Sequence, residues 1–232
     1  MTQSMPQRKA LAAVTRALLL ICVPIILIVS PLYLYVTSAF VELQYRLPYV
    51  SESTRFELPE RERLSDTLIG YLRHSASETD MATLQTSDGQ VAMRPAEVSH
   101  MVDVRDVMDS FFAAHLVALV VLAGLVALVL RLGLERPLAD GLAAGVWMVL
   151  GLMGTILVAV IVDFDGFFTL FHKLFFVDDT WLFYFEDTLI QLYPLGFWIG
   201  AVTWVALTIV AEGVLILWLA GRIRRHAERA SD

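Results

Sequence analysis

Cysteine is nearly absent from this chain, which contains only Cys22 among its 232 residues. A single cysteine excludes an intramolecular disulfide and any paired CxxC motif. The sequence also lacks a GxSxG nucleophile elbow, an HExxH zinc-binding helix and a phosphate-binding glycine loop. Serine hydrolases and cysteine hydrolases are therefore unsupported as function classes.

Charge is missing from two long stretches, Phe111–Leu130 and Gly141–Val162, which contain no Asp, Glu, Lys or Arg. The whole chain is 57% hydrophobic, with a mean hydropathy of +0.66. A helix needs about 20 apolar residues to cross a bilayer core. The sequence has four such runs, and it therefore predicts four transmembrane helices: Ala17–Phe40, Phe111–Leu130, Gly141–Val162 and Leu195–Ala220.

Basic residues are unevenly distributed around these runs. If the chain crosses four times, nine of them fall on one side: Arg8, Lys9, Arg16, Arg131, Arg136, Arg222, Arg224, Arg225 and Arg229. Short loops rich in Lys and Arg stay in the cytoplasm. We therefore expect both termini to be cytoplasmic, and we expect the first run to be retained as a helix rather than cleaved as a signal peptide.

The expected fold is a membrane all-α bundle of four transmembrane helices with a small extracytoplasmic α+β cap domain. In the cap, Val41–Val50 is rich in aromatic and branched residues and predicts a strand. Pro59–His74 has the apolar spacing of an amphipathic helix, and Asp88-Gly89 between short runs indicates a hairpin. Pro95 predicts the start of a helix that continues through Leu130.

The crossings divide the chain into nine expected segments. These are the leader 1–16, helix 17–40, cap 41–109, helix 110–131, cytoplasmic loop 132–140, helix 141–162, extracytoplasmic aromatic loop 163–194, helix 195–220 and cytoplasmic tail 221–232. The aromatic loop is typical of an interfacial belt or a re-entrant segment, and the same residues would also suit a lipid groove.

Two of the five histidines, His100 and His172, are expected at the outer membrane surface, where they can approach each other. Glu97 and Asp103 lie three residues to either side of His100, on adjoining helix faces. An imidazole between an apolar wall and a carboxylate can act as a general base near neutral pH. A purely structural role fits these two histidines equally well. His74 and His226 are expected to be surface residues, and His115 a packing residue inside the bundle.

The residues around these histidines resemble the lipoprotein intramolecular transacylase (Lit) family of bacterial membrane proteins. The resemblance covers nearly the whole chain, and two short motifs and the residues after them carry it: His100-Met101-Val102-Asp103-Val104, Phe171-His172-Lys173-Leu174-Phe175-Phe176, Asp179, Trp181, Asp187-Thr188-Leu189-Ile190, Pro194 and Phe197. The chain departs from the family pattern after Trp181, where the family usually has Asp-Pro, and a differently shaped loop is expected there.

This resemblance implies an acyltransferase of the bacterial cytoplasmic membrane that uses no cofactor and no metal. Its substrates would be diacylglyceryl-modified lipoproteins in the membrane lipid, from which one ester-linked acyl chain moves to the α-amine of the terminal cysteine and leaves the lyso-form. The two family histidines map onto His100 and His172. We expect support from Asp103, Lys173, Asp178 and Asp179, and a substrate groove formed by Phe171, Phe175, Phe176 and Trp181.

Two other functions stay open on the residues alone. A non-catalytic membrane protein could use its cap to bind a lipid or a protein partner. A metal-dependent membrane hydrolase could use the two histidines with nearby carboxylates, although their spacing matches no known zinc motif. No nucleic-acid partner is expected.

Overall fold

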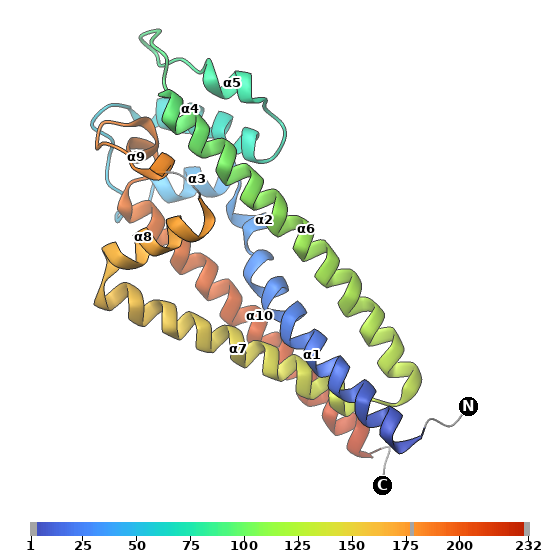
Figure 1. Ribbon diagram of the computed structural model, residues 1–232. Helices are drawn as coiled ribbons and strands as arrows, with labels where there is room; N and C mark the ends of the chain where they lie inside the picture. The colour runs from blue at the N-terminus through green and yellow to red at the C-terminus, as the bar shows by residue number, and fades with distance from the viewer. Residues whose placement is uncertain (1–3, 177–178, 230–232) are drawn as a thin grey trace. The chain divides into compact units, whose positions relative to one another are not determined.

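The computed structural model describes residues 4–176 and 179–229, and helices account for most of them (Figure 1). In chain order the elements are α1 (Met5–Val29), α2 (Leu32–Tyr35), α3 (Ser38–Tyr45), α4 (Leu58–Leu72), α5 (Glu78–Ala82), α6 (Pro95–Leu132), α7 (Glu135–Val162), α8 (Phe164–Phe175), the 3-10 helix η1 (Asp179–Trp181), α9 (Thr188–Leu192) and α10 (Leu195–Arg229).

Four helical segments are long and apolar enough to cross a membrane: Met5–Tyr35, Pro95–Leu132, Glu135–Val162 and Leu195–Arg229. The prediction of four apolar membrane helices is confirmed. The prediction that Pro95 begins a helix continuous with the second apolar run is also confirmed, because α6 extends from Pro95 to Leu132 without a break. Polar turns extend these helices beyond their apolar runs.

The predicted α+β character of the cap is wrong. Within residues 4–176 and 179–229, β-pairing consists of one isolated antiparallel bridge between Gln85 and Val91. The turn expected between them does form. Gly89 has a φ of +80°, and its N–H donates to the carbonyl of Thr86 at 2.9 Å. The pairing does not extend into a ladder, so the cap is helical.

The segment Val41–Val50 was expected to be a strand, and its first half is instead the end of α3. Thr37 caps this helix by accepting the N–H of Phe40 at 3.3 Å. Branched and aromatic residues favour strands only weakly, because burial and packing override propensity. The buried residues follow the spacing of a helix rather than the alternation of a strand: Phe40, Val41, Gln44 and Tyr45.

The chain divides into two compact units. The first consists of Met1–Pro31, Phe111–Val158 and Ala206–Asp232, and the second of Leu32–Ser110 and Ala159–Val205. In the first unit, α1 packs on α7 through glycines. A Cβ on Gly141 would lie 2.5 Å from Cδ1 of Leu19, and one on Gly145 would lie 2.6 Å from Cβ of Val23. Glycines four residues apart let two membrane helices approach closely.

An ionic contact joins three helices of the first unit. Asp140 of α7 pairs with Arg16 of α1 at 2.9 Å and also with Arg224 of α10. His115 of α6 is buried, and its Nε2 lies 3.4 Å from the hydroxyl of Ser30. His115 is therefore a packing residue within the bundle, as predicted.

The second unit has a core that joins α4 to the start of α6 and to α9. Its buried members are Phe56, Leu64, Leu68, Tyr71, Met81, Leu84, Ala92, Met93, Met101, Leu189 and Leu192. The predicted amphipathic helix is confirmed as α4, which supplies Leu64, Leu68 and Tyr71. Because Met101 of α6 and Leu189 of α9 share this core, the residue next to His100 is packed in the same core as the last helix of the aromatic loop.

Buried Arg61 of α4 fixes the carboxyl end of α9. Its guanidinium donates to the carbonyl oxygens of Ser51 and Leu192, each at 3.2 Å, and lies 4.1 Å from the ring centroid of Tyr45. The last carbonyls of a helix have no partner within the helix. Arg61 satisfies one of these carbonyls and ties α9 to the core of the second unit.

Candidate functional site

His100 and His172 lie close together in the second unit. His100 is in the second turn of α6, and His172 is near the end of α8. Their ring centroids are 6.4 Å apart, and the ring planes are inclined by 28°. The sequence predicted that these two histidines could approach each other, and the structure brings them together.

His172 is held in one orientation by its own helix. Its Nδ1 lies 2.8 Å from the carbonyl oxygen of Phe168, one turn earlier. A carbonyl only accepts hydrogen bonds, so Nδ1 carries the proton and Nε2 of the neutral ring keeps a free lone pair. Burial lowers the pKa of His172, and the bond to the Phe168 carbonyl opposes part of that shift. The lowered pKa favours the unprotonated ring at neutral pH.

His100 is enclosed by aromatic rings. Its ring centroid lies 4.9 Å from that of Phe176 and 5.3 Å from that of Phe183. Its Nδ1 is buried and has no hydrogen-bond partner among the residues that the structure describes. An unsatisfied buried polar atom carries a free-energy penalty, so its presence calls for an explanation. A substrate atom that bonds to Nδ1 would remove that penalty.

Aromatic side chains also surround His172. Four ring centroids lie near its own: Phe168 at 4.0 Å, Trp181 at 4.9 Å, Phe171 at 5.5 Å and Phe176 at 5.7 Å. Trp181 is buried, whereas Phe171 is exposed. Phe175 packs on Phe171 at 5.0 Å. Three of the four predicted groove residues thus contact His172 directly, and the fourth extends the same aromatic surface.

The predicted supporting residues occupy different positions. Asp103 accepts a hydrogen bond from the hydroxyl of Thr180 in η1 at 3.2 Å, and no contact between Asp103 and His100 is found in the described part of the chain. Lys173 is exposed on α8. Asp178 lies outside the described residues, and Asp179 is described only as the first residue of η1. Asp103 thus contacts the aromatic loop through Thr180.

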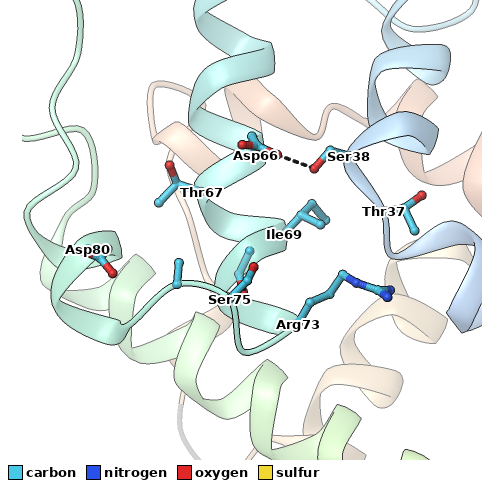
Figure 2. A pocket seen from close by; sticks show the side chains of 10 residues that line it. Thr37, Ser38, Asp66, Thr67, Ile69, Arg73, Ser75 and Asp80 are labelled. Atoms are coloured by element: carbon cyan, nitrogen blue, oxygen red, sulfur yellow. Dashed lines mark hydrogen bonds between the residues drawn. The ribbon is translucent and has the colours of Figure 1, made fainter.

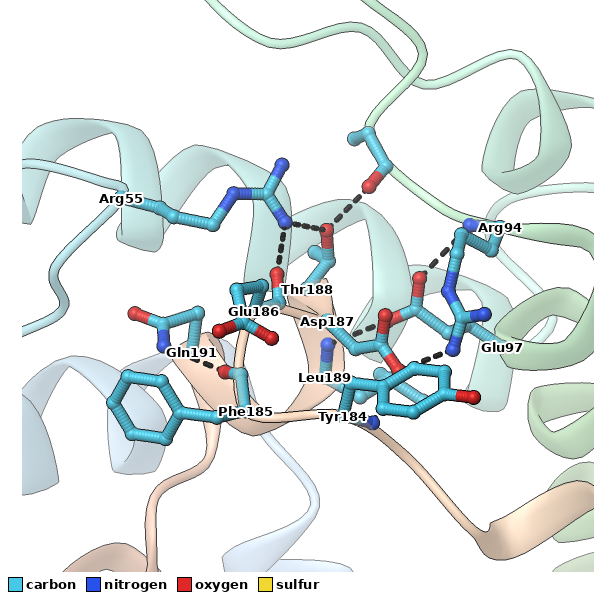
Figure 3. Close-up of polar contacts among 11 residues, drawn as sticks. Arg55, Arg94, Glu97, Tyr184, Phe185, Glu186, Asp187, Thr188, Leu189 and Gln191 are labelled. Carbon is cyan, nitrogen blue, oxygen red and sulfur yellow. Dashed lines mark hydrogen bonds and ion pairs between the residues drawn. The ribbon is translucent and has the colours of Figure 1, made fainter.

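A polar network one helical turn before His100 was not expected (Figure 3). Glu97 is fully buried and accepts the backbone N–H groups of Arg94 and Leu189, each at 2.8 Å. Arg94 pairs with Asp187, and the hydroxyl of Thr188 donates to the carbonyl of Ala92. Pro95 followed by Glu97 is the spacing of a helix start with a capping glutamate, so part of this network could be predicted from the sequence.

The second unit also has a polar cavity of about 490 Å³ (Figure 2). Residues from α3, α4, α5 and the segments joining them line it. Across the cavity, the hydroxyl of Ser38 donates to Asp66 at 2.5 Å, and Arg73 donates to the carbonyl of Val36 at 3.0 Å. Of the predicted site residues that the structure describes, none lines this cavity. Among the described residues, no group of three or more His, Cys, Asp or Glu could hold a metal ion.

Comparisons with known proteins find relatives in sequence and in fold. An uncharacterized protein of Aquifex aeolicus (strain VF5) is 26% identical over 188 residues, which covers 78% of this chain and 82% of the relative. The lipoprotein intramolecular transacylase Lit from Bacillus cereus has a similar fold, with a TM-score of 0.68, 18% identity and 97% coverage of both chains. A variant of the same enzyme, with one histidine replaced by alanine, gives a TM-score of 0.69 at 19% identity and 96% coverage of both chains.

The family assignment rests on the sequence itself. Residues 17–198 match the sequence pattern of the family described as lipoprotein intramolecular transacylase Lit, and this match includes both histidines and the aromatic loop. It spans well over half of the chain. The chain is therefore a multi-pass integral membrane protein that belongs to the lipoprotein intramolecular transacylase family, whose substrates are lipoproteins.

Proposed function

We propose that this enzyme moves one acyl chain within a diacylglyceryl-modified lipoprotein, from a glycerol ester to the α-amine of the terminal cysteine. The observation that carries this proposal is the pair formed by His100 and His172, with ring centroids 6.4 Å apart, in a chain of this family. The substrate supplies both the nucleophile and the ester. The protein therefore needs a base and a way to stabilise the oxyanion, and it needs no nucleophile of its own.

The reaction balances with one proton-accepting group. An α-amine has a pKa of about 7.7–8.0 and must lose a proton before it attacks. The amine nitrogen then forms a bond to the ester carbonyl carbon, and the tetrahedral intermediate breaks its bond to the glycerol oxygen. The ammonium proton goes to water before the attack, and the base takes one of the two protons left on the attacking nitrogen and delivers it to the glycerol oxygen. The products are an amide on the terminal cysteine and a free glycerol hydroxyl, which is the lyso-form.

His172 is proposed as the base. Its Nδ1 is bonded to the Phe168 carbonyl, so its Nε2 is the nitrogen that can accept a proton. Its lowered pKa keeps this nitrogen unprotonated at neutral pH. This assignment goes beyond the sequence, in which the two histidines were equivalent candidates.

His100 is proposed as the residue that stabilises the oxyanion of the tetrahedral intermediate. A neutral imidazole carries one N–H, and the buried Nδ1 has no partner among the described residues. A preorganised donor in an apolar setting contributes more to such stabilisation than it would in water. Exposed Lys173 is the alternative donor, and Asp103 is proposed to act through Thr180.

The surroundings of the pair suit a substrate held in lipid. On α8, Leu170 and Leu174 are 68% and 74% exposed, whereas Asp165, Thr169 and Lys173 recur every four residues on another face. Such a helix is suited to the plane of a membrane interface. We place it at the outer leaflet of a bacterial cytoplasmic membrane with both termini cytoplasmic, because the nine basic residues then lie inside.

The test is mass spectrometry of the N-terminal lipopeptide of a reporter lipoprotein. The bacterial host must lack other N-acylating enzymes and express wild type, His100→Ala, His172→Ala or His226→Ala. His226 is exposed near the end of α10 and serves as a matched control. The N-acyl, mono-acylglyceryl form should appear with wild type and His226→Ala only. Unmodified diacyl lipoprotein in cells with correctly inserted wild type would reject the proposal.

A further inference from the structure

Glu97 caps two helices with one carboxylate (Figure 3). It is the third residue of α6, and one of its oxygens accepts the N–H of Arg94, immediately before that helix, at 2.8 Å. Its other oxygen accepts the N–H of Leu189, the second residue of α9, also at 2.8 Å. The N–H groups at a helix start have no partner within the helix. Asp187 precedes α9 but makes no side-chain capping bond, so Glu97 takes that role from another element.

The segment Thr180–Leu189, which we call the strap, is bonded at both ends to α6 or to the residues just before α6. At its start, Thr180 donates to Asp103. At its end, Asp187 pairs with Arg94 and accepts the N–H of Tyr184 at 2.7 Å. The next two residues are held by the Ala92 carbonyl and by Glu97. The strap is therefore fixed to the helix that carries His100.

Two aromatic residues of the strap contact the two histidines separately. Trp181 lies 4.9 Å from the ring of His172, and Phe183 lies 5.3 Å from the ring of His100. Two strap residues separated by one position thus contact α8 and α6 respectively. A shift of the strap along α6 would therefore displace, at the same time, the aromatic side chains that pack on the two imidazoles.

We propose that Glu97 is a positioning residue for the histidine pair, acting by holding the start of α9, and with it the strap, in register with α6. This inference rests on the proposed function of that pair. Glu97 touches neither ring, so its effect on the reaction passes through Trp181 and Phe183. A misplacement of about 1 Å in a catalytic group can lower a rate by roughly 100-fold.

Only glutamate fits this position. A glutamine keeps the length but has one acceptor oxygen, and its NH₂ group would face one of the two backbone N–H groups. An aspartate keeps both oxygens but is one methylene shorter, so it cannot reach both helix starts. The substitutions Glu97→Gln and Glu97→Asp therefore each remove one anchor with little change in volume. Glu78→Gln, at an exposed residue of α5, makes the same chemical change without a capping role in α6 or α9.

Two measurements on the full-length protein in detergent test the proposal. Hydrogen exchange of the peptide covering residues 180–192 reports whether the strap is held, with no reference to activity. Acyl transfer on a synthetic diacylglyceryl lipopeptide gives kcat and KM separately. For both Glu97 variants, exchange of this peptide should be roughly tenfold faster or more. Their kcat should fall roughly 10- to 100-fold with KM unchanged. Glu78→Gln should match wild type in both measurements.

Several outcomes would overturn the proposal. These are a kcat for Glu97→Gln within twofold of wild type, exchange of the strap that does not change, or an equal rise in exchange throughout the second unit. Failure of both Glu97 variants to accumulate as folded protein, while Glu78→Gln does, would make Glu97 a general structural residue. If wild type shows no acyl transfer, the proposed function fails on its own, and the exchange measurement still decides whether Glu97 holds the strap.

Discussion

Replacing Gly145 with alanine should loosen the contact between α1 and α7. A Cβ at this position would lie 2.6 Å from Cβ of Val23 and 3.1 Å from the carbonyl oxygen of Leu19, whereas ordinary contact begins at 3.4 Å. Val23 is buried, and its Cβ cannot move without its backbone. The two helices would have to separate by about 0.8 Å, the difference between 2.6 and 3.4 Å.

The size of the effect follows from two opposing terms. Overpacking of a close contact costs about 1–3 kcal/mol. Alanine stabilises a helix by about 1 kcal/mol relative to glycine, which offsets part of that cost. The net loss for Gly145→Ala is therefore up to about 2 kcal/mol. In a chain of this length, a loss of about 2 kcal/mol lowers Tm by roughly 4–8 °C.

The assay is thermal unfolding of the purified protein in a mild detergent, with Gly151→Ala as the control. Gly151 lies on the same helix, and a Cβ there would meet no atom within 4 Å in the described part of the chain. Its Tm should stay the same or rise slightly. Equal Tm values for the two variants would refute the reasoning, because the close approach of α1 and α7 would then carry no stability.

Three further predictions concern the site and the bundle. The ring of His172 should titrate by NMR with a midpoint below pH 6.5, because burial lowers its pKa. His172 should then lose its activity as a base only as the pH falls through that midpoint. A midpoint at or above pH 6.5 would contradict the assignment. Thr180→Val should reduce kcat more than Asp103→Asn, because the amide oxygen introduced by Asp103→Asn can still accept the hydrogen bond from the Thr180 hydroxyl. The reverse order would show that the charge of Asp103 matters more than this hydrogen bond. Asp140→Asn should lower Tm at low salt by an amount equivalent to about 1 kcal/mol or less, and the difference should shrink at high salt; a difference independent of salt would argue against an ionic origin.

Much of the fold was predictable because its signals are local. An apolar run of about 20 residues defines a membrane helix without reference to the rest of the chain. Pro95 marks the start of α6 in the same local way. α3 shows where such reasoning failed. The composition of Val41–Val50 favoured a strand, whereas the cap at Thr37 and the apolar spacing before Tyr45 favoured a helix. The spacing was the better guide, since it reflects what the core of the second unit can bury.

The site was predictable only in part, for a related reason. Topology alone placed His100 and His172 at similar depth, and their approach followed from that. The partners of Glu97 could not be found in this way, because Leu189 lies 92 residues further along the chain. Nor could the sequence reveal that Asp103 bonds to Thr180. Hydrogen bonds between distant segments depend on the final packing, and no local pattern specifies them.

The two histidines are held by contacts that differ in their separation along the chain, and this difference affects which substitutions should alter the reaction. His172 is oriented within α8 by a hydrogen bond to a carbonyl one turn earlier in the same helix. The setting of His100 depends on a loop that is held at its two ends by Asp103 and Glu97. In the proposed acyl transfer, which uses no protein nucleophile, placement of the reacting groups would supply much of the rate. Changes that shift the strap should therefore move the side chains packed on both rings, and they should leave in place the hydrogen bond that fixes the tautomer of His172.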